Sequence, residues 1–405
     1  MTAVDTAVLD HLDTDAVVAL TQQLVRIRSV NDHGATVVEA PVADVVADLM
    51  RGFGWPVTVT EVAPGRPNVV AVVQGSAPGR TLMFEGHSDV VTPGDDTDWT
   101  FDPFAGDIVD GRLRGRGAAD MKSGVAAMIH AARAVELAGF TGRLVVGVLA
   151  DEEGMMRGAK HFAASPAAYG VDGPIDGVIV CEPEGGEICP VTKGAVRLRV
   201  DIHGRMAHGA MPQMGRNPVP VVARLILGLA ELEQQLGERY PAHPDLGPFY
   251  LTPTVLAAGS AEQVNVIPAL ASVYLDLRTL PGMEHEGLVQ VIGLLADQVA
   301  DESGVTARVT VIDDRPPVDT DRDAPVVQAL VTAHAAVGES PVVFGGVPGS
   351  TDGTILTRDA GLETVVYGPG GKWIAHQADE YADVSDILRC ARVFAVAAAG
   401  FLAAP

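Results

Sequence analysis

Apolar residues in the first half of the chain alternate between two spacings. A spacing of three or four residues predicts helices, the first of them with Asp15 as its N-cap. Short apolar runs bounded by turn residues predict buried strands between the helices. The predicted helices cover 15–27, 39–54 and 123–140, and the predicted strands cover 68–75, 81–90, 142–149 and 176–185. Such alternation is typical of an α/β fold with a mostly parallel sheet covered on both faces.

The pattern changes near Lys193, where apolar and polar residues alternate strictly. This alternation predicts antiparallel strands with one face in water, and two long amphipathic segments between them predict helices. After about residue 315 the α/β pattern returns, with a helix and then a strand. The strands cover 195–204, 271–281 and 305–312, the helices 217–240 and 284–304, and the last two elements 324–338 and 361–370. We therefore predict a discontinuous α/β domain, 1–192 and 315–405, with an inserted α+β domain over 193–314.

Composition excludes several classes of partner. The chain has 405 residues and a net charge of -24, so nucleic acid and anionic membranes are poor partners. It holds no uncharged apolar run of membrane-spanning length, so we expect no membrane partner. The first twenty residues carry acids where a signal peptide needs positive charge, and the three cysteines form no CxxC pair. We therefore expect a cytoplasmic protein.

Histidines and carboxylates stand where the predicted strands end. His87 and Asp89 are two residues apart, so their side chains point the same way in extended chain. The other candidates follow a strand, precede a helix or lie in a late loop: Asp120, Glu152, Glu153, Glu182 and His376. Because parallel strands end at one edge of a sheet, we expect all of them to converge there.

Two histidines and three or more carboxylates form a ligand set typical of Zn²⁺, Co²⁺ or Mn²⁺. One zinc ion needs about three protein ligands plus water, and this set is larger. Two ions roughly 3.5–4 Å apart that share a bridging carboxylate would use the whole set. They would also offset the repulsion within the acidic tripeptide 151–153. One of its two glutamates can bind metal, and the other can act as general base.

Five segments occur in an order that resembles one family of hydrolases. They are GHSDVV (86–91), GRGAADMKSG (115–124), ADEEG (150–154), CEPEG (181–185) and AHQADEY (375–381). Together they resemble the acetylornithine deacetylase/succinyl-diaminopimelate desuccinylase family, which has carboxypeptidase G and the aminoacylases as relatives. The resemblance covers nearly the whole chain. It implies a di-zinc hydrolase of amide bonds with a catalytic α/β domain and an inserted lid or dimerisation domain.

The resemblance also implies a role for each candidate residue. Asp89 would orient His87, and Glu152 would be the general base. Glutamate at position 182 resembles the deacylases and the carboxypeptidase-like members, whereas aspartate is commoner in di- and tripeptidases. The implied metal ligands are His87 and Glu182 for one ion, Glu153 and His376 for the other, and Asp120 as the bridge.

The inserted domain contributes three further residues by resemblance. The segment HGRMAHGAMP matches one that supplies an oxyanion-stabilising histidine, which gives His208 that role. Asn265 in VNVIPA and Arg278 in DLRTLPG resemble groups that contact the substrate or its carboxylate. In relatives that dimerise through this domain, the matching histidine reaches the partner's site. We therefore expect a homodimer in which His208 acts on the neighbouring chain.

The predicted function is a two-metal amidohydrolase that cleaves the amide bond of an N-acyl amino acid with metal-activated water. Two Zn²⁺ ions per chain are expected, with Co²⁺ or Mn²⁺ as substitutes. A dipeptidase or a carboxypeptidase G-like enzyme would carry out the same chemistry and remains an alternative. A non-catalytic metal-binding protein on the same fold is a further alternative, against which the complete ligand set and Glu152 argue. A nucleotide-binding protein is disfavoured because no phosphate-binding glycine motif follows a strand.

Overall fold

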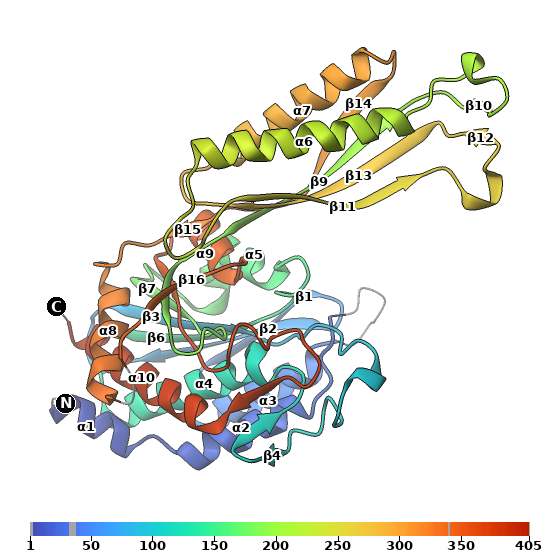
Figure 1. The fold of residues 1–405 in the computed structure, drawn as a ribbon. Coiled ribbons are helices and arrows are strands. Elements are labelled where there is room, and N and C mark those ends of the chain that lie inside the picture. Colours follow the sequence, from blue (N-terminus) through green and yellow to red (C-terminus); the bar gives the residue numbers. More distant parts are fainter. Residues whose placement is uncertain (1–2, 32–37, 339–340, 405) are drawn as a thin grey trace. The chain divides into compact units, whose positions relative to one another are not determined.

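A computed structural model describes residues 3–31, 38–338 and 341–404 of the chain (Figure 1). These residues form two units, each with its own sheet. The small unit runs from Thr192 to Val318, where the sequence predicted 193–314, and includes Pro348–Ser350. Its action as a lid or in dimerisation stays a prediction. The large unit consists of Met1–Val191, Asp319–Val347 and Thr351–Pro405.

The large unit is built on a nine-stranded sheet in the order β1-β2-β6-β3-β7-β17-β8-β15, with β16 beside β8. The four central strands, β6, β3, β7 and β17, are parallel, whereas β1, β2 and β8 pair antiparallel with their neighbours. The predicted α/β fold with a mostly parallel sheet is confirmed. The strands are β1 (Val57–Ala63), β2 (Arg66–Gln74), β3 (Thr81–His87), β6 (Arg143–Leu149), β7 (Gly177–Val180), β8 (Ile188–Thr192), β15 (Val318–Asp319), β16 (Phe344–Val347) and β17 (Thr364–Val366).

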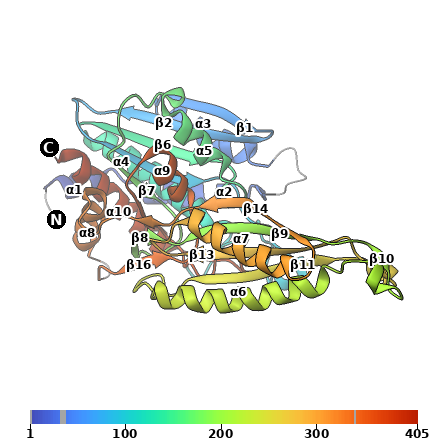
Figure 2. The same ribbon diagram turned by 90° about the horizontal axis from the view of Figure 1, so that it is seen from above.

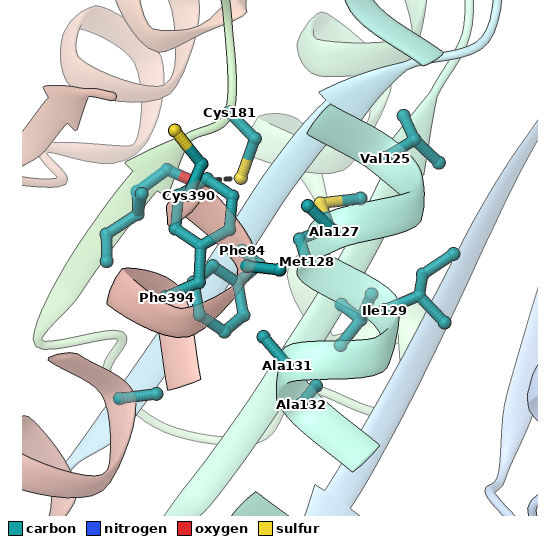
Figure 3. Packing of buried hydrophobic residues seen from close by; sticks show 14 of the residues in the cluster. Phe84, Val125, Ala127, Met128, Ile129, Ala131, Ala132, Cys181, Cys390 and Phe394 are labelled. Carbon is teal, nitrogen blue, oxygen red and sulfur yellow. Dashed lines mark hydrogen bonds between the residues drawn. The ribbon is translucent and has the colours of Figure 1, made fainter. Parts of the chain in front are cut away.

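Helices cover both faces of this sheet, as the fully buried central strands require. Val69 and Val73 of β2 face the helices on one side, and Val70 and Val72 face those on the other. Figure 3 shows the first side, where α4 and α10 pack together. Phe84 of β3 meets Phe394 of α10 there, with ring centroids 5.4 Å apart. The first side holds α1 (Ala3–Asp10), α2 (Thr14–Val25), α3 (Ala40–Gly52), α4 (Ser123–Ala138), α8 (Pro325–Val337) and α10 (Val384–Ala403), and the second α5 (Arg157–Ala164) and α9 (Asp352–Ala360).

The N-cap predicted for the first long helix is wrong. Asp13, not Asp15, has the extended backbone of a cap residue, with φ -79° and ψ 93°. Its carboxylate accepts the N–H of Ala16 at 2.9 Å. Asp15 lies inside the first turn, where its charge still favours the positive end of the helix dipole.

The small unit is a four-stranded antiparallel sheet with two helices on one face (Figures 1 and 2). Its strand order is β11-β13-β9-β14, and β13 pairs with β9 over its whole length, from Leu270↔His203 to Thr279↔Gly194. A separate two-stranded pair, β10 with β12, carries Ala207 and His208. The elements are β9 (Gly194–His203), β10 (Ala207–His208), α6 (Val219–Arg239), β11 (Tyr250–Ala258), β12 (Val266–Ile267), β13 (Leu270–Thr279), α7 (His285–Asp301) and β14 (Thr306–Arg315).

Candidate metal and catalytic site

The parallel strands of the large unit bring the first site residues together. His87 is the last residue of β3 and pairs with Leu149 at the end of β6. On the other side of β3, Glu85 pairs with Val180 at the end of β7. The segments that carry the acidic tripeptide and Glu182 therefore begin at the same edge of the sheet as His87, as the sequence predicted.

Asp120 reaches this edge from the loop that precedes α4, and a second carboxylate holds that loop in place. One oxygen of the buried Glu380, Oε1, accepts the backbone N–H groups of Gly117, Ala119 and Asp120 at 3.0, 2.9 and 3.1 Å. Its other oxygen pairs with the buried Arg116. The path of the loop is thus fixed from inside, and the Asp120 side chain is left to face the site.

The two oxygens of Asp120 face two different histidines. Oδ1 lies 3.1 Å from Nε2 of His87, and Oδ2 lies 3.1 Å from Nε2 of His376. Glu182 stands beside the first histidine, with Oε1 3.5 Å from the same Nε2. Glu153 stands beside the second, with Oε1 3.0 Å from His376 Nε2. The five predicted ligands therefore form two pairs on either side of one shared carboxylate.

These distances fit divalent ions between the side chains. Two atoms bound to one tetrahedral zinc at about 2.0–2.1 Å stand roughly 3.3 Å apart, close to the separations within each half of the cluster. Nδ1 of His87 lies 2.9 Å from the backbone carbonyl oxygen of Asp89. This contact favours a proton on Nδ1 and leaves Nε2 free to bind a metal. The donor set, two imidazoles and three carboxylates, is the one that zinc and similar ions take.

The close packing of the cluster shifts the pKa values of its histidines and glutamates. Contacts with Asp120 and then Glu153 raise the pKa of His376 to about 11. Burial alone would lower the pKa of His87, but the charge of Glu182 and the contact with Asp120 raise it well above 6.5. Burial and then the charge of Asp120 raise the pKa of Glu182 and of Glu153 above 4.5. The carboxylates thus favour positive charge at both histidines, as they would favour a bound cation.

Asp89 organises the tripeptide from behind. Its Oδ1 accepts the backbone N–H of Glu152 and its Oδ2 that of Glu153, both at 3.1 Å. Asn31 donates to the same Oδ2 at 2.6 Å. The Asp89 carboxylate lies 3.5 Å from Nδ1 of His87, farther than the backbone carbonyl that this nitrogen contacts. Asp89 therefore fixes the backbone of Glu152, the candidate base, and of Glu153, a candidate ligand. It contacts His87 mainly through its own backbone carbonyl.

The three consecutive acids point to three different surroundings. Asp151 is fully buried and meets Arg66 at 3.3 Å and the amide of Asn31 at 3.1 Å. Glu152 is mostly buried, and its carboxylate forms a close group with the imidazole of His87 and the carboxylate of Glu182. Glu153 belongs to the His376 half of the cluster. Only two of the three charges therefore add to the site, while Arg66 neutralises the third.

The residues predicted in the small unit lie at its two ends. Asn265 adjoins His208, because its carbonyl oxygen accepts the N–H of Gly209 at 2.6 Å, next to the pair His208↔Val266. Arg278 lies at the other end of β13, beside the residues where the chain enters the small unit. Its guanidinium contacts Asp276 through Nε at 2.6 Å and Nη2 at 3.3 Å. These residues form no single cluster within the unit.

Sequence reasoning missed the supporting residues of the site. Glu380 lies in the segment AHQADEY (375–381), but only the structure shows that it holds the Asp120 loop. Asn31, Arg66 and Glu39 lie far from the site residues in sequence and carry no spacing signal. In the structure Arg66 pairs with Glu39 at 2.7 Å and donates to Asn31 at 3.1 Å, behind Asp89.

Known proteins are similar to this chain in sequence and fold. The model of peptidase family M20/M25/M40 matches residues 83–399. The chain is 32% identical over 403 residues to a succinyl-diaminopimelate desuccinylase of Methylobacterium radiotolerans, covering 95% of this chain and 96% of that protein. It is 33% identical to an acetylornithine deacetylase of Myxococcus xanthus, covering 82% and 84%.

Solved structures with the same fold include two described as peptidases. The di-peptidase Dug1p of Saccharomyces cerevisiae is similar with a TM-score of 0.78 and 16% identity, over 99% of each chain. A Bacillus subtilis protein described as a dinuclear metal binding peptidase is similar with a TM-score of 0.72 and 17% identity, over 96% of this chain and 98% of that one. Within the described residues, no helix is both long and apolar enough to cross a membrane.

Proposed function

The chain belongs to peptidase family M20/M25/M40, and from that premise we propose that it is a two-metal amidohydrolase of N-acyl amino acids. Membership makes it a metal-dependent hydrolase of amide bonds. The position of Asp120 is the observation that supports two metal ions. One of its oxygens faces the pair of His87 and Glu182, and the other faces the pair of His376 and Glu153. Zinc is the proposed ion, with Co²⁺ or Mn²⁺ as substitutes.

The five ligands would divide as the geometry suggests. His87 and Glu182 would hold one ion, Glu153 and His376 the other, and Asp120 would bridge them. When bound, two such ions supply Lewis acidity and lower the pKa of water towards neutrality.

Glu152 is the proposed general base. Its carboxylate stands among the ligand atoms of the His87 half, while its backbone N–H is held by Asp89. In this position it can take a proton from the attacking water and return it to the leaving amine. Replacing Glu152 with alanine should leave metal binding intact and lower turnover on the order of 10²–10⁴-fold. Elemental analysis and kinetics on one sample test this, and parental turnover in the variant would reject Glu152 as the base.

His208 is the proposed oxyanion donor, and its surroundings suit that role. The backbone N–H of Ala210 donates to Nδ1 of His208 at 3.0 Å. Nδ1 is thus an acceptor, so the neutral ring carries its proton on Nε2 and can donate it to a developing negative charge. Arg278 is proposed to bind the substrate carboxylate, with Nη1 left beyond its contacts with Asp276.

The dimensions of the small unit support the proposal that His208 acts in the partner's site. Eight residue steps along extended β13 lead from Leu270, at the end near His203, to Arg278, a span of about 26 Å. The backbone of a dipeptide-sized substrate spans at most about 7 Å. If His208 and Arg278 serve one substrate, they therefore come from two chains, which fits the proposed homodimer.

Mixing two inactive variants, His208→Ala and Glu152→Ala, tests this arrangement. After subunit exchange, half of the dimers are mixed, and one site in each combines an intact Glu152 with an intact His208. Recovery of about a quarter of parental activity supports action in the partner's site. Exchange confirmed by mass spectrometry without recovered activity would place His208 in its own site or outside catalysis.

The acyl amino acid is the proposed substrate because the two curated relatives named above are a desuccinylase and a deacetylase. The glutamate at position 182 points the same way. A panel of N-acetyl, N-succinyl and N-formyl amino acids beside dipeptides, assayed with Zn²⁺, Co²⁺ and Mn²⁺, tests the assignment. Preference for an acyl amino acid supports it. Preference for dipeptides would reassign the enzyme as a dipeptidase, and fewer than two ions in the fully active protein would reject the two-metal site.

A further inference from the structure

His376 is the most exposed of the proposed ligands, and it lies in an irregular loop. Its side chain is 52% exposed, whereas that of His87 is 1% exposed. Two backbone hydrogen bonds within residues 371–377 form local turns, one from the Ile374 N–H to the Gly371 carbonyl and one from the Gln377 N–H to the Ile374 carbonyl. Such bonds shape the loop but do not fix it to the rest of the large unit. After His376 the chain is fixed, because Asp379 accepts the N–H and the hydroxyl of Thr100 at 2.7 and 2.9 Å and Glu380 pairs with Arg116. An anchor is therefore needed on the side before His376.

Lys372 supplies such an anchor four residues before His376. Its ammonium lies 2.8 Å from Oε2 of Glu184 and 2.8 Å from Oε2 of Glu187. It also donates to the carbonyl oxygen of Gly346 at 3.4 Å. A lysine has three N–H donors, so these contacts satisfy the ammonium completely. The Lys372 side chain is 17% exposed and that of Glu184 is 3% exposed, so the pair is shielded from water and salt.

The anchor point belongs to the other half of the site. Glu184 lies two residues after Glu182, a proposed ligand of the first ion. The two loops are also joined by backbone bonds, from Gly185 N–H to the Gly370 carbonyl at 2.7 Å and from Gly186 N–H to the Gly368 carbonyl at 3.2 Å. Lys372 therefore links the chain that carries one half of the ligand set to the chain that carries the other.

Gly370 shows how closely these loops meet. Its φ is +88°, and a Cβ placed there would stand 2.9 Å from Cα of Ala119, the residue before Asp120. The loop thus lies against the segment of the bridging carboxylate just before Lys372. The chain has only four lysines, at 122, 160, 193 and 372, and otherwise uses arginine. A compact ammonium suits a point where two carboxylates and a carbonyl must be joined in a small space.

We propose that Lys372 is a positioning residue for the metal site: by joining the His376 loop to Glu184 and Glu187, it sets the affinity for the ion held by Glu153 and His376. The proposal rests on the two-metal function proposed above. Lys372 touches neither ion and acts only through the position of His376. Removing it should weaken the ion of the His376 half and leave that of the His87 half nearly unchanged.

Three variants test this. Lys372→Met removes the ammonium but leaves Glu184 buried without its partner. Lys372→Met/Glu184→Gln removes both charges, so that the fold does not have to bury an uncompensated carboxylate. Arg133→Met is the matched control, because it removes a partly buried cation paired with Glu136 on α4. Thermal unfolding of the metal-free proteins shows which of them fold as the parent does.

Metal affinity is then measured by competition with a chromophoric chelator, and the Co²⁺ absorption spectrum reports the ligands of each ion. The parent and Arg133→Met should hold two ions with similar affinities. Both Lys372 variants should release one ion about 10- to 100-fold more easily and lose its part of the Co²⁺ spectrum. The inference is overturned if the folded double variant holds both ions as the parent does. A parent that holds fewer than two ions would overturn the proposed function itself, and the inference with it.

Discussion

The two halves of the proposed site differ in how the chain holds them. His87 ends a central strand of the sheet and Glu182 follows one, and their side chains are 1% and 8% exposed. In the other half Glu153 is nearly as buried, but His376 sits in a loop and is half exposed. Asp120 serves both halves with equal distances. One shared ligand thus joins a half fixed by the core of the fold to a half fixed by a few polar contacts.

The difference follows from the source of each position. β3 and β7 are buried along their whole length and are hydrogen-bonded to neighbours on both sides. His376 instead has a positive φ of 66°, which non-glycine residues adopt rarely and only where their surroundings hold them. The strand-borne half should therefore keep its geometry without metal, and the loop-borne half should depend on contacts such as those of Lys372.

The largest effect is expected from removing the ligand that both halves share. Asp120→Ala should abolish tight binding of both ions, because each half is left with one histidine and one glutamate. Activity should fall by at least the 10²–10⁴-fold roughly expected for loss of a general base. Elemental analysis after dialysis measures the metal. Asp48→Ala, at an exposed position on α3, is the control. Two tightly held ions in Asp120→Ala would show that the halves are independent.

The strand-borne half was predictable from sequence because its signal is local. Apolar runs at 81–90, 142–149 and 176–185 end in the residues that the structure brings to one edge. Contacts between distant segments left no such signal. Glu380 holds the Asp120 loop although more than 250 residues separate the two in sequence, and no sequence pattern indicates this contact. The structure and the family thus agree with the predicted fold. The network of supporting hydrogen bonds could be found only in the structure.

The sequence also missed an entire strand of the small unit. β11 is an edge strand with Pro253 inside it and a shift in its pairing register between Pro253 and Val255. Proline and irregular register interrupt the alternation on which strand prediction depends, and an edge strand tolerates both. All but one of its residues are exposed, so the strand has no buried face that would produce an alternating apolar pattern.

The next largest effect separates the two halves directly. His376→Ala should lose one ion and keep the other, because His87, Glu182 and Asp120 remain intact. His87→Ala should weaken the first ion and also destabilise the fold, because it empties a buried position between β6 and β7. Ion counts and thermal unfolding of both variants measure the contrast. Equal stability losses in the two variants would contradict the proposed difference between the strand-borne half and the loop-borne half.

A smaller effect is expected at Glu380. Glu380→Gln keeps the side-chain shape but removes the charge that faces Arg116 and weakens the acceptor of three backbone N–H groups. Because the Asp120 loop serves both halves, the two ions should weaken together, about 10- to 100-fold. Chelator competition measures each affinity. Selective loss of one ion would mean that Glu380 acts on one half alone.

The smallest effect on metal binding is expected at Glu39, which instead gives the strand-borne half a pH dependence of stability. Burial and then the charge of Asp89 raise the pKa of Glu39 to about 8 from its ordinary 4.5. Ser88, next to His87, donates to its carboxylate at 2.6 Å. The folded chain therefore holds this proton more tightly than the unfolded chain. Its contribution to stability is complete below pH 4.5 and is lost as the pH rises through 8.

Between these two pH values the metal-free protein should lose stability by up to about 1.4 kcal/mol per pH unit through this one group. Glu39→Gln should remove that slope, because an amide does not titrate. His376→Ala should keep it, because Glu39 contacts the His87 side of the site and not the loop. Denaturant unfolding of chelated protein at several pH values between 5 and 6.5 measures all three proteins, because below 6.5 His376 is protonated in the folded and the unfolded chain and adds no slope of its own. If His376→Ala flattens the slope as much as Glu39→Gln does, the two halves titrate as one unit, and the buried half is not independent of the exposed one.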